Sequence, residues 1–322
     1  MKAVHIARTG GPEVLELVDL PPPEPGPGEI LVRQEAIGLN FVDTYHRSGL
    51  YPVDLPAVLG SEGAGVVEMV GEDVTRFKPG DRVGYAAGRG AYADYCVVPE
   101  DRAVRLPEGV SSRTAAGAMM KGLTAEMLVR QCYPLKAGET CLVWAAAGGV
   151  GSILVQWAKA IGAVVIGCVG SELKVRTARA LGCDHVILYK SEDVAARVRE
   201  ITDDQGVRVA YDGVGKASFD ASLTSLGRRG MLVSYGNASG PVPPIMPLTL
   251  ARHGSLYLTR PTVFDYITNA TEMDAASAAL FEAIQSGAVR VEIGLEFPLA
   301  QARQAHEAIE SGTTTGSILL IP

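Results

Sequence analysis

A short glycine-rich turn, residues 146–151 (AAGGVG), has the residue types and spacing that bind phosphate. It matches the pattern A-x-G-x-x-G, with Ala146 at the position where a dinucleotide fingerprint usually has its first glycine. A side chain at Gly148 would keep the backbone away from a pyrophosphate, and one at Gly151 would hold the next helix off the preceding strand. Because N–H groups at a helix start attract anions, the turn predicts a dinucleotide site. The alternative is a plain turn between a strand and a helix.

The segments on both sides of this turn favour the phosphate site. Residues 141–145 form a short apolar run with the length and composition of a buried parallel strand. Apolar residues then recur at helical spacing over residues 151–161. Strand, glycine turn and helix follow one another in the order that a dinucleotide-binding unit requires.

Strands and helices alternate over residues 121–258. Further strands are expected at 163–169, 185–188, 207–212, 230–235 and 255–259, and further helices at 172–181, 192–202 and 217–226. Alternation at this spacing predicts an α/β domain with a parallel, doubly wound sheet, whose site lies at the carboxyl ends of the strands.

Residues 1–120 have a different rhythm, with short alternating strands separated by glycine and proline. This pattern predicts a mostly antiparallel, barrel-like domain. Residues 40–56 within it (NFVDTYHRSGLYPVDLP) are expected to form an irregular loop, whose polar aromatic residues suit a binding site. The tail, residues 259–322, has two helical stretches and one closing strand, so it is expected to return to the first domain. We therefore expect a discontinuous catalytic domain, 1–120 with 259–322, and a dinucleotide-binding domain, 121–258.

The composition argues against several classes of function. The 322 residues carry a formal charge of -7, which disfavours general affinity for nucleic acid or anionic membranes. The five cysteines are an odd number without a C-x-x-C pair, so they imply neither a disulfide framework nor a zinc cluster, and reduced, cytoplasmic thiols fit best. The first residues lack the apolar core of a signal peptide. The most apolar region, 142–170, is interrupted by polar residues, so no membrane span is expected.

The run from Gly138 to Lys159 (GETCLVWAAAGGVGSILVQWAK) resembles the signature of the quinone oxidoreductase and zeta-crystallin group of medium-chain dehydrogenases/reductases. The similarity covers nearly the whole chain, in segments such as GLNFVDTYHRSGLYP, LGSEGAGVV, KPGDRVGY, KGLTAE, SLYLTRP and the terminal SILLIP. The resemblance implies a GroES-like barrel domain, a Rossmann-type nucleotide domain, NADPH as cofactor and a small quinone as substrate. It also implies a homodimer formed by edge strands near residues 253–259.

The same superfamily contains zinc alcohol dehydrogenases, and their ligand positions are changed in this sequence. Asn40 stands where the zinc enzymes have a cysteine, and Ser61 stands where they have the histidine of G-H-E, before Glu62. A catalytic zinc needs about three protein ligands, so no zinc is expected. Without a Lewis acid, alcohol oxidation is disfavoured. A quinone or an activated enone is already electron-poor and can accept hydride with hydrogen-bond help alone.

The end of the second strand in the nucleotide domain bears on the choice of nucleotide. NAD-specific sheets usually present an acid there, whereas this strand ends Val169-Gly170-Ser171, which leaves room for a 2′-phosphate. Glu172 is the competing candidate, but it lies past the strand end, where it can face solvent. Lys174 supplies a positive charge and Tyr189 a hydroxyl, and both match positions that bind the 2′-phosphate in the family. NADPH is therefore the expected cofactor.

Further cofactor contacts are expected by resemblance. Together with Gly170 and Ser171 they are Thr124, Ala147, Gly148, Gly149, Val150, Val214, Tyr235, Gly236 and Asn237. Family members often have an arginine near the end of the final helix, where this chain has residues 311–313 (SGT). That departure bears on how strongly the phosphate is held.

The candidates for the substrate pocket are Asn40, Asp43, Tyr45, Tyr51 and Arg260, and Asn40, Tyr45 and Arg260 are also expected to contact the cofactor. Tyrosine hydroxyls and an asparagine amide can donate to a quinone oxygen as negative charge develops there. Arg260 can neutralise phosphate or developing quinolate charge. Structural alternatives stay open: a turn role for Asn40, loop packing for the tyrosines and a surface ion pair for Arg260. Asp43 suits an orienting or turn role better than that of an acid.

The leading hypothesis is a zinc-independent NADPH:quinone oxidoreductase, with the electrons passing either as one hydride or singly. The first alternative is an NADPH-dependent enone or alkenal reductase on the same frame. The second is a non-catalytic NADPH-binding protein. A cytoplasmic homodimer without nucleic-acid or membrane partners is expected.

Overall fold

The computed structural model describes residues 1–322, and the chain divides into two compact units. The first unit contains residues 1–123, 267–285 and 291–322, and the second contains residues 124–266 and 286–290. These boundaries differ from the ones expected from the sequence, after residues 120 and 258. The short return of residues 286–290 to the second unit has no counterpart in that expectation. Each unit has a hydrophobic core of its own.

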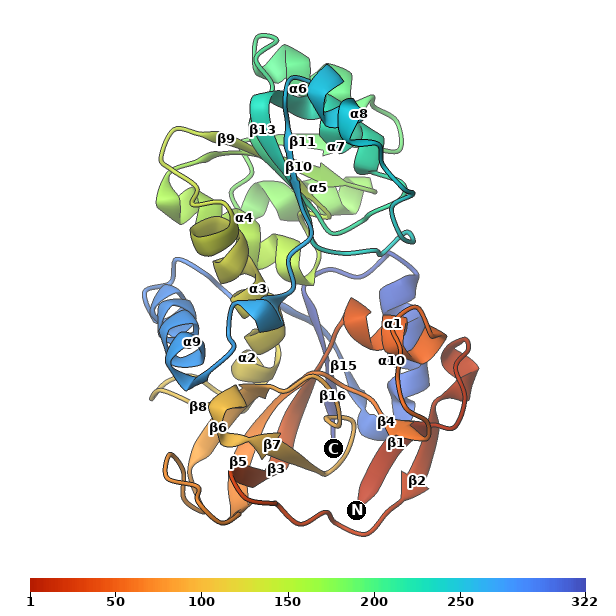
Figure 1. Ribbon diagram of the computed structural model, residues 1–322, viewed down its shortest axis with the longest axis vertical. Helices are drawn as coiled ribbons and strands as arrows, with labels where there is room; N and C mark the ends of the chain where they lie inside the picture. The colour runs from red at the N-terminus through yellow and green to blue at the C-terminus, as the bar shows by residue number, and fades with distance from the viewer. The chain divides into compact units, whose positions relative to one another are not determined.

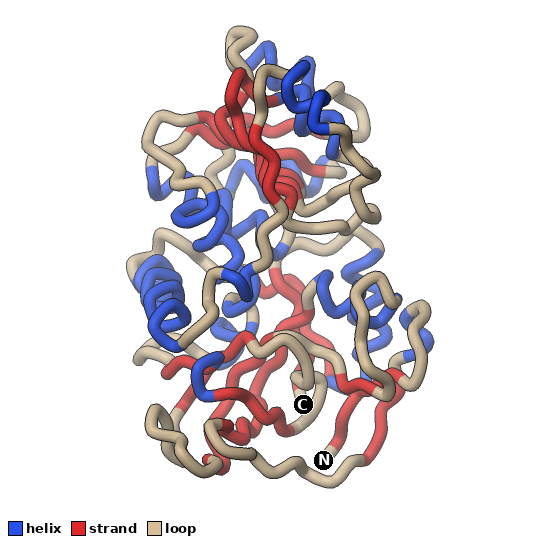
Figure 2. The backbone as a smooth tube through the Cα atoms, in the orientation of Figure 1, coloured by secondary structure: helices blue, strands red, loops and turns tan.

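The second unit is built around a six-stranded sheet in which all neighbouring strands are parallel (Figures 1 and 2). The strands are β9 (Thr140–Trp144), β10 (Val164–Val169), β11 (His185–Leu188), β12 (Val207–Asp212), β13 (Leu226–Ser234) and β14 (Tyr257–Thr259). The helices are α4 (Gly149–Ile161), α5 (Glu172–Ala180), α6 (Val194–Ile201), α7 (Phe219–Ser225) and α8 (Pro247–Arg252), with a short η4 (Val263–Asp265). The predicted parallel, doubly wound sheet is confirmed.

The direction of winding reverses in the middle of this sheet, whose order is β11-β10-β9-β12-β13-β14. From β9 the chain passes through α4 and α5 toward β11 at one edge, and from β12 it passes through α7 and α8 toward β14 at the other. Figure 1 shows α4 on one side of the sheet and α7 on the other; α4 contacts β9 and β10, and α7 contacts β12 and β13. In such sheets, ligands bind outside the carboxyl ends of the strands at the reversal.

The first unit contains two sheets in which every strand pair except β15–β16 is antiparallel. The larger sheet has β3 (Glu29–Leu39), β5 (Glu62–Val70), β6 (Arg82–Ala86), β7 (Tyr95–Pro99), β8 (Ala103–Arg105), β15 (Ile293–Pro298) and β16 (Ser317–Ile321). The smaller has β1 (Lys2–Ile6), β2 (Glu16–Asp19) and β4 (Ala57–Val58). The predicted mostly antiparallel domain is confirmed.

The helices of the first unit are α1 (Phe41–Ser48), α2 (Ser112–Ala116), α9 (Ala270–Gln285) and α10 (Ala302–Glu310), with short turns η1 (Pro12–Val14), η2 (Glu100–Arg102) and η5 (Leu299–Gln301). Helix α3 (Met119–Glu126) contains the boundary between the units and continues as a π-helix, η3 (Met127–Cys132). None of the helices combines the length and apolarity that crossing a bilayer requires.

Strand β3 is the centre of the larger sheet, because it pairs with β5, β7 and β16. Residues 318–320 of β16 pair with residues 37–39 of β3, so the last strand of the chain completes a sheet begun near its start. Strand β15 beside it was not predicted. Its sequence, IGLEFP, has no buried residue, and a mostly exposed edge strand has too weak an alternation of apolar and polar residues to be recognised.

The prediction that residues 40–56 form an irregular loop was wrong for residues 41–48, which form α1. Asn40 precedes the helix with an extended backbone, and the Asp43 carboxylate accepts a hydrogen bond from the Asn40 N–H at 2.8 Å. Gly49 ends the helix with φ of +83°, a conformation that glycine adopts without a steric penalty. Asparagine followed three residues later by an acid is a helix-start pattern that the polar, aromatic composition of this segment obscured.

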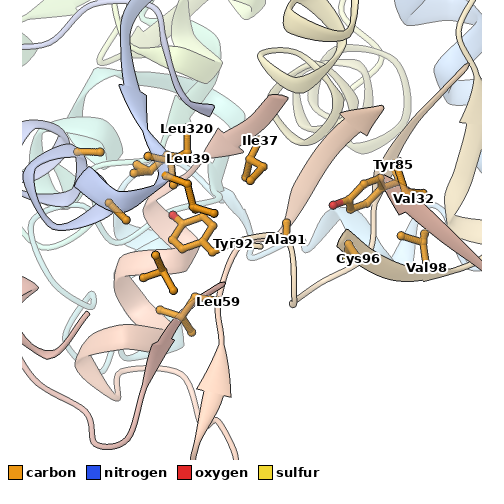
Figure 3. Packing of buried hydrophobic residues seen from close by; sticks show 14 of the residues in the cluster. Val32, Ile37, Leu39, Leu59, Tyr85, Ala91, Tyr92, Cys96, Val98 and Leu320 are labelled. Carbon is orange, nitrogen blue, oxygen red and sulfur yellow. The ribbon is translucent and has the colours of Figure 1, made fainter. Parts of the chain in front are cut away.

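The core of the first unit encloses one polar group in particular, the hydroxyl of Tyr92. The ring lies among Leu39, Leu59 and Leu320 in Figure 3 and is fully buried. A buried tyrosine hydroxyl needs a hydrogen-bond partner. The partners of Tyr92 come from α1 and α10, so the core leads directly to the polar centre described below.

Candidate functional site

The carboxyl edge of the parallel sheet gathers most of the predicted cofactor residues. Because the strands are parallel, residues that follow their last positions lie along one edge. After β9, β10, β11, β12 and β13 come, in turn, Ala147 to Val150, Gly170 and Ser171, Tyr189, Val214, and Tyr235 to Asn237. Arg260 follows β14 at the same edge and is exposed. Thr124 lies in α3 and at no strand end.

The turn after β9 is as tight as its glycines predicted. Ala145 adopts a φ of +51°, and its carbonyl accepts from the Gly148 N–H at 2.8 Å. A Cβ on Gly151 would overlap the Ala145 carbonyl oxygen, so only glycine lets α4 start this close to β9. Helix α4 then begins at Gly149 with its first N–H groups directed out of the turn. This arrangement suits the pyrophosphate of a dinucleotide.

The ends of β10 and β11 form the region expected to hold a 2′-phosphate. A Cβ on Gly170 would lie 2.6 Å from the Tyr189 hydroxyl oxygen, so the glycine makes room for this tyrosine. The Tyr189 ring packs at 5.6 Å from the Trp144 ring and remains 41% exposed. Ser171 and Glu172 at the start of α5 are exposed, as expected for an acid that faces solvent.

A second lysine joins Lys174 in this region. Burial lowers the pKa of Lys174, and the charge of Lys190 lowers it further, so the two ammonium groups are close enough to repel each other. An anion between them would relieve that repulsion. Lys190 was not among the residues predicted from the sequence, although it directly follows Tyr189 and the pair Tyr-Lys was a usable signal.

The loop that carries Val214 is fixed by a buried carboxylate at the end of β12. Asp212 accepts from the N–H groups of Val214 at 2.8 Å and Gly215 at 3.1 Å. The hydroxyls of Ser218 and Ser222 donate to it at 2.7 Å. Sequence analysis missed this cluster. The spacing of the serines, six and ten residues after the aspartate and one helical turn apart, was its signal.

In the first unit, Asn40 is held between two buried carboxylates. Its backbone N–H donates to Asp43 Oδ2 at 2.8 Å, and its side-chain Nδ2 donates to Glu62 Oε1 at 2.8 Å. Ser61 Oγ donates to the other Asp43 oxygen at 2.6 Å. Because a carboxylate only accepts, these contacts decide which end of the Asn40 amide faces Glu62.

Glu62 is fully buried and pairs with Lys121, which is also buried. Lys121 Nζ donates to Glu62 Oε1 at 2.6 Å, and the Met120 N–H donates to Glu62 Oε2 at 2.6 Å. Together with Asn40, three donors therefore surround this carboxylate. Neither Glu62 nor Lys121 was among the candidates chosen from the sequence, since a lysine 59 residues away gives no local signal.

A chain of buried hydrogen bonds continues from Asp43 to the surface through α10. Arginine only donates, so the 3.1 Å contact from the Arg47 guanidinium makes His306 Nδ1 the acceptor. His306 then carries its proton on Nε2 and donates to the Tyr92 hydroxyl at 3.0 Å, and Tyr92 donates to Asp43 Oδ2 at 3.2 Å. Arg47 also pairs with Glu310 at 2.7 Å. Every hydrogen bond in this series therefore donates toward Asp43. The series orients Asp43 but offers no proton path, because Arg47 does not release its proton.

Burial shifts the pKa values of two groups in this series of hydrogen bonds in opposite directions. Burial, followed by the Arg47 charge, lowers the pKa of His306 to about 3, so the imidazole is neutral at pH 7. Burial raises the pKa of Asp43 to about 6 despite its hydrogen bonds, with the Glu62 charge raising it and the Lys121 charge lowering it. Asp43 is then ionised at pH 7, which agrees with three donors directed at its two oxygens.

Tyr45 and Tyr51 lie together on and after α1. Their ring centroids are 5.2 Å apart in an edge-on arrangement, and the Tyr51 N–H donates to the Tyr45 carbonyl at 3.1 Å. Asn40, Asp43, Tyr45 and Tyr51 thus belong to one short stretch of the first unit. Arg260, the fifth pocket candidate, belongs to the second unit.

The side chains at the positions of the zinc ligands do not suit a metal ion. Asn40 Nδ2 and Ser61 Oγ are used as donors, and Glu62 shares its oxygens between an ammonium, an amide and a backbone N–H. A metal at Glu62 would meet the Lys121 charge. The chain contains no group of three His, Cys, Asp or Glu side chains that could hold a metal ion.

Comparison with known proteins agrees with this geometry. Residues 26–108 match the alcohol dehydrogenase GroES-like domain, and residues 149–282 match the zinc-binding dehydrogenase domain. The chain is 51% identical to the quinone oxidoreductase of Pseudomonas aeruginosa, over 100% of this chain and 99% of that protein. The chain belongs to the quinone oxidoreductase family.

Two further relatives are known by different ligands. The structure of Escherichia coli quinone oxidoreductase complexed with NADPH superposes with a TM-score of 0.98, at 46% identity and full coverage of both chains. A 2-haloacrylate reductase from a Burkholderia species is 42% identical over 99% of this chain and 98% of its own length. The relatives of this chain therefore include at least one protein named for a different electron-poor substrate.

Proposed function

We propose that the protein is an NADPH:quinone oxidoreductase that reduces small quinones without a metal ion. The first unit is the catalytic domain, and the second is the dinucleotide-binding domain. The observation that carries the proposal is the carboxyl edge of the parallel sheet, where a glycine turn, two lysines and the Asp212-braced loop lie at neighbouring strand ends. The quinone oxidoreductase of E. coli, which shares this fold, is complexed with NADPH.

Different residues along that edge are proposed to bind different parts of the cofactor. Ala147 to Val150 at the start of α4 suit the pyrophosphate, because the first N–H groups of a helix have no partner within the helix. Lys174 and Tyr189 suit the 2′-phosphate, with Gly170 and Ser171 leaving it space and Lys190 adding charge. Bound NADPH supplies the hydride. The remaining proposed contacts are Thr124, Val214, Tyr235, Gly236, Asn237 and Arg260.

The proposed substrate residues are Asn40, Tyr45, Tyr51 and Arg260, with Asp43 as a positioning group. Reduction of a quinone to its hydroquinone takes one hydride and one proton, and negative charge develops on the oxygens before the proton arrives. Hydrogen-bond donors fixed near that charge lower the barrier. Asn40 and Tyr45 are suited to this role because α1 and its Asp43 brace hold them in place.

NADPH oxidation tests the proposal. With 1,4-naphthoquinone, we expect turnover with NADPH and at least tenfold lower kcat/KM with NADH, since one charged hydrogen bond is worth roughly 1.5–3 kcal/mol. The 42% identity to a haloacrylate reductase favours an electron-poor alkene as the second candidate substrate class. A large preference for a 2-alkenal or a 2-haloacrylate over quinones would move the assignment to that class. NADPH binding without turnover of any of them would leave a non-catalytic role.

The proposal extends to assembly and location. Strand β14 is the edge of the parallel sheet, and Tyr257 on it and Met246 and Leu248 before it are exposed apolar side chains. We propose that two copies join along this edge into a homodimer, which light scattering after gel filtration would measure. The five cysteines are unpaired, which supports a reducing, cytoplasmic location.

A further inference from the structure

Both side chains of the Glu62–Lys121 ion pair are almost completely inaccessible to solvent. The proposed chemistry has so far given this pair no role. Glu62 is the first residue of β5, and Lys121 lies in α3. Burying two charges costs several kcal/mol per ion before their attraction is counted, and apolar residues often stabilise a fold equally well. A pair of this kind therefore calls for a reason other than stability.

The geometry connects the pair to a proposed substrate residue. Lys121 Nζ and Asn40 Nδ2 donate to the same oxygen, Glu62 Oε1, at 2.6 and 2.8 Å. The other oxygen of Glu62 accepts from the Met120 N–H at 2.6 Å. All three partners are donors. The arrangement is satisfied only while Glu62 is a carboxylate that accepts on both oxygens.

Removal of the Lys121 charge would upset this arrangement. Without Lys121, Glu62 Oε1 would keep only the Asn40 amide as a donor, and the ammonium would no longer hold the carboxylate in its place. The Met120 N–H is part of the backbone and cannot turn away, whereas the Asn40 amide can rotate.

We propose that Lys121 is a positioning residue that acts through Glu62 to fix the orientation of the Asn40 amide. One Nδ2 hydrogen is committed to Glu62, which leaves at most one for a ligand, and the pair determines its direction. The ligand group it suits is an acceptor oxygen, either the carbonyl oxygen of a quinone or an oxygen of the nicotinamide riboside part of the cofactor. This inference rests on the proposed function for the identity of the ligand.

A double-mutant cycle between Lys121 and Asn40 tests the connection. Lys121→Met keeps the length of the side chain and removes the charge. We expect on the order of a tenfold loss of kcat/KM for 1,4-naphthoquinone at saturating NADPH in the parent, and less than a twofold further loss in an Asn40→Ala background. Equal losses in both backgrounds would show that Lys121 does not act through Asn40. The Kd of NADPH, measured without quinone, locates the acceptor oxygen. If Lys121→Met raises this Kd, the oxygen belongs to the cofactor. If it lowers only kcat/KM, the oxygen belongs to the quinone.

Lys159→Met is the matched control, because Lys159 also pairs with a carboxylate, Asp184 at 2.8 Å, in a half-buried setting of the second unit. It should change neither quantity in either background. If Lys121→Met does not fold, Lys121→Gln replaces it, since glutamine keeps a neutral donor for Glu62. That variant should show a smaller loss that again disappears in the Asn40→Ala background.

A second readout does not depend on turnover. The chain has only three asparagines, Asn40, Asn237 and Asn269, so selective ¹⁵N-asparagine labelling gives three side-chain amide pairs in an NMR spectrum. The Asn40 pair is assigned by its loss in Asn40→Ala. We expect one of its hydrogens to exchange slowly with solvent in the parent and several-fold faster in Lys121→Met. An unchanged Asn40 signal and exchange rate would overturn the inference, even if no quinone proved to be a substrate.

Discussion

Each unit holds a buried carboxylate beside a proposed ligand site, and the two carboxylates are held by different kinds of donor. Asp212 in the second unit is held by neutral donors, two serine hydroxyls and two backbone N–H groups. Glu62 in the first unit is held by an ammonium, an amide and a backbone N–H. The partners of Asp212 lie within ten residues of it, whereas Lys121 lies 59 residues from Glu62.

The two carboxylate clusters should differ in how well they accommodate the substitution of one partner. Serine hydroxyls both donate and accept, so the Asp212 cluster can rearrange when one partner changes. Ammonium and backbone N–H groups only donate, so the Glu62 cluster cannot. We therefore regard the Asp212 cluster as a local support for a proposed cofactor loop, and the Glu62 cluster as a rigid set of contacts that fixes one amide.

Glu62→Gln should be strongly destabilising, by about 3 kcal/mol in the free energy of unfolding, because it leaves Lys121 buried without a counter-charge. A glutamine amide also cannot accept on both sides, so it would direct a donor at either Asn40 or the Met120 N–H. Urea denaturation followed by circular dichroism measures the loss. A cost below about 1 kcal/mol would show that the first unit rearranges as freely as the second.

The pH dependence of stability should show the cost of burying Asp43. Its pKa is raised in the folded chain, from 3.8 to about 6, so the folded chain binds more protons than the unfolded chain between these values. Stability from this group is therefore greatest below about pH 4, falls as the pH rises to about 6, and is level above that. The full effect is about 3 kcal/mol.

The difference in unfolding free energy between the parent and Asp43→Asn, followed from pH 4 to 7, isolates this titration from other groups. A difference that is flat over this range would contradict the burial argument.

Lys174→Ala should reduce the ratio of kcat/KM for NADPH to that for NADH by on the order of ten- to a hundredfold, since a charged hydrogen bond contributes roughly 1.5–3 kcal/mol. Lys190→Ala should reduce the ratio less, because that side chain is exposed. An unchanged ratio in Lys174→Ala would remove this lysine from the proposed 2′-phosphate site.

Asp212→Asn should be the mildest change, about 1 kcal/mol or less in stability. The asparagine carbonyl can still accept hydrogen bonds from the N–H groups of Val214 and Gly215, while the hydroxyls of Ser218 and Ser222 turn to accept from its NH₂ group. Ser218 already has a second acceptor in the Gly215 carbonyl at 3.1 Å. The Kd of NADPH should rise less than threefold, as measured by fluorescence titration. A loss as large as that of Glu62→Gln would mean that the two centres do not differ as proposed.

The same contrast explains how much the sequence could predict. The second unit is built from local strand–helix repeats, so periodicity alone located its strands, helices α4 to α7 and the glycine turn within a few residues, whereas α8 was not predicted. Most cofactor candidates came from the family resemblance, and this order of elements places them at strand ends. Lys190 and the serines around Asp212 were missed although they are local, because a single surface lysine or a serine has many ordinary roles.

The first unit is decided by contacts that are distant in the sequence. Its sheet joins β3 with β16, and its polar centre joins Arg47 with His306, 259 residues away. No pattern within one segment indicates such a partner. The sequence therefore singled out Asn40, Asp43, Tyr45 and Tyr51 but not the groups that orient them. Helix α1 was missed for a related reason, because its buried face includes Asp43 and Arg47, whose side-chain partners lie elsewhere in the sequence.

The most direct test of metal-free, NADPH-dependent quinone reduction is steady-state NADPH oxidation with 1,4-naphthoquinone by protein dialysed against a strong chelator. We expect the rate to equal that of untreated protein, and added zinc to leave it unchanged, because Lys121 and Asn40 already occupy the Glu62 carboxylate. Loss of turnover on chelation, restored by zinc, would contradict the account.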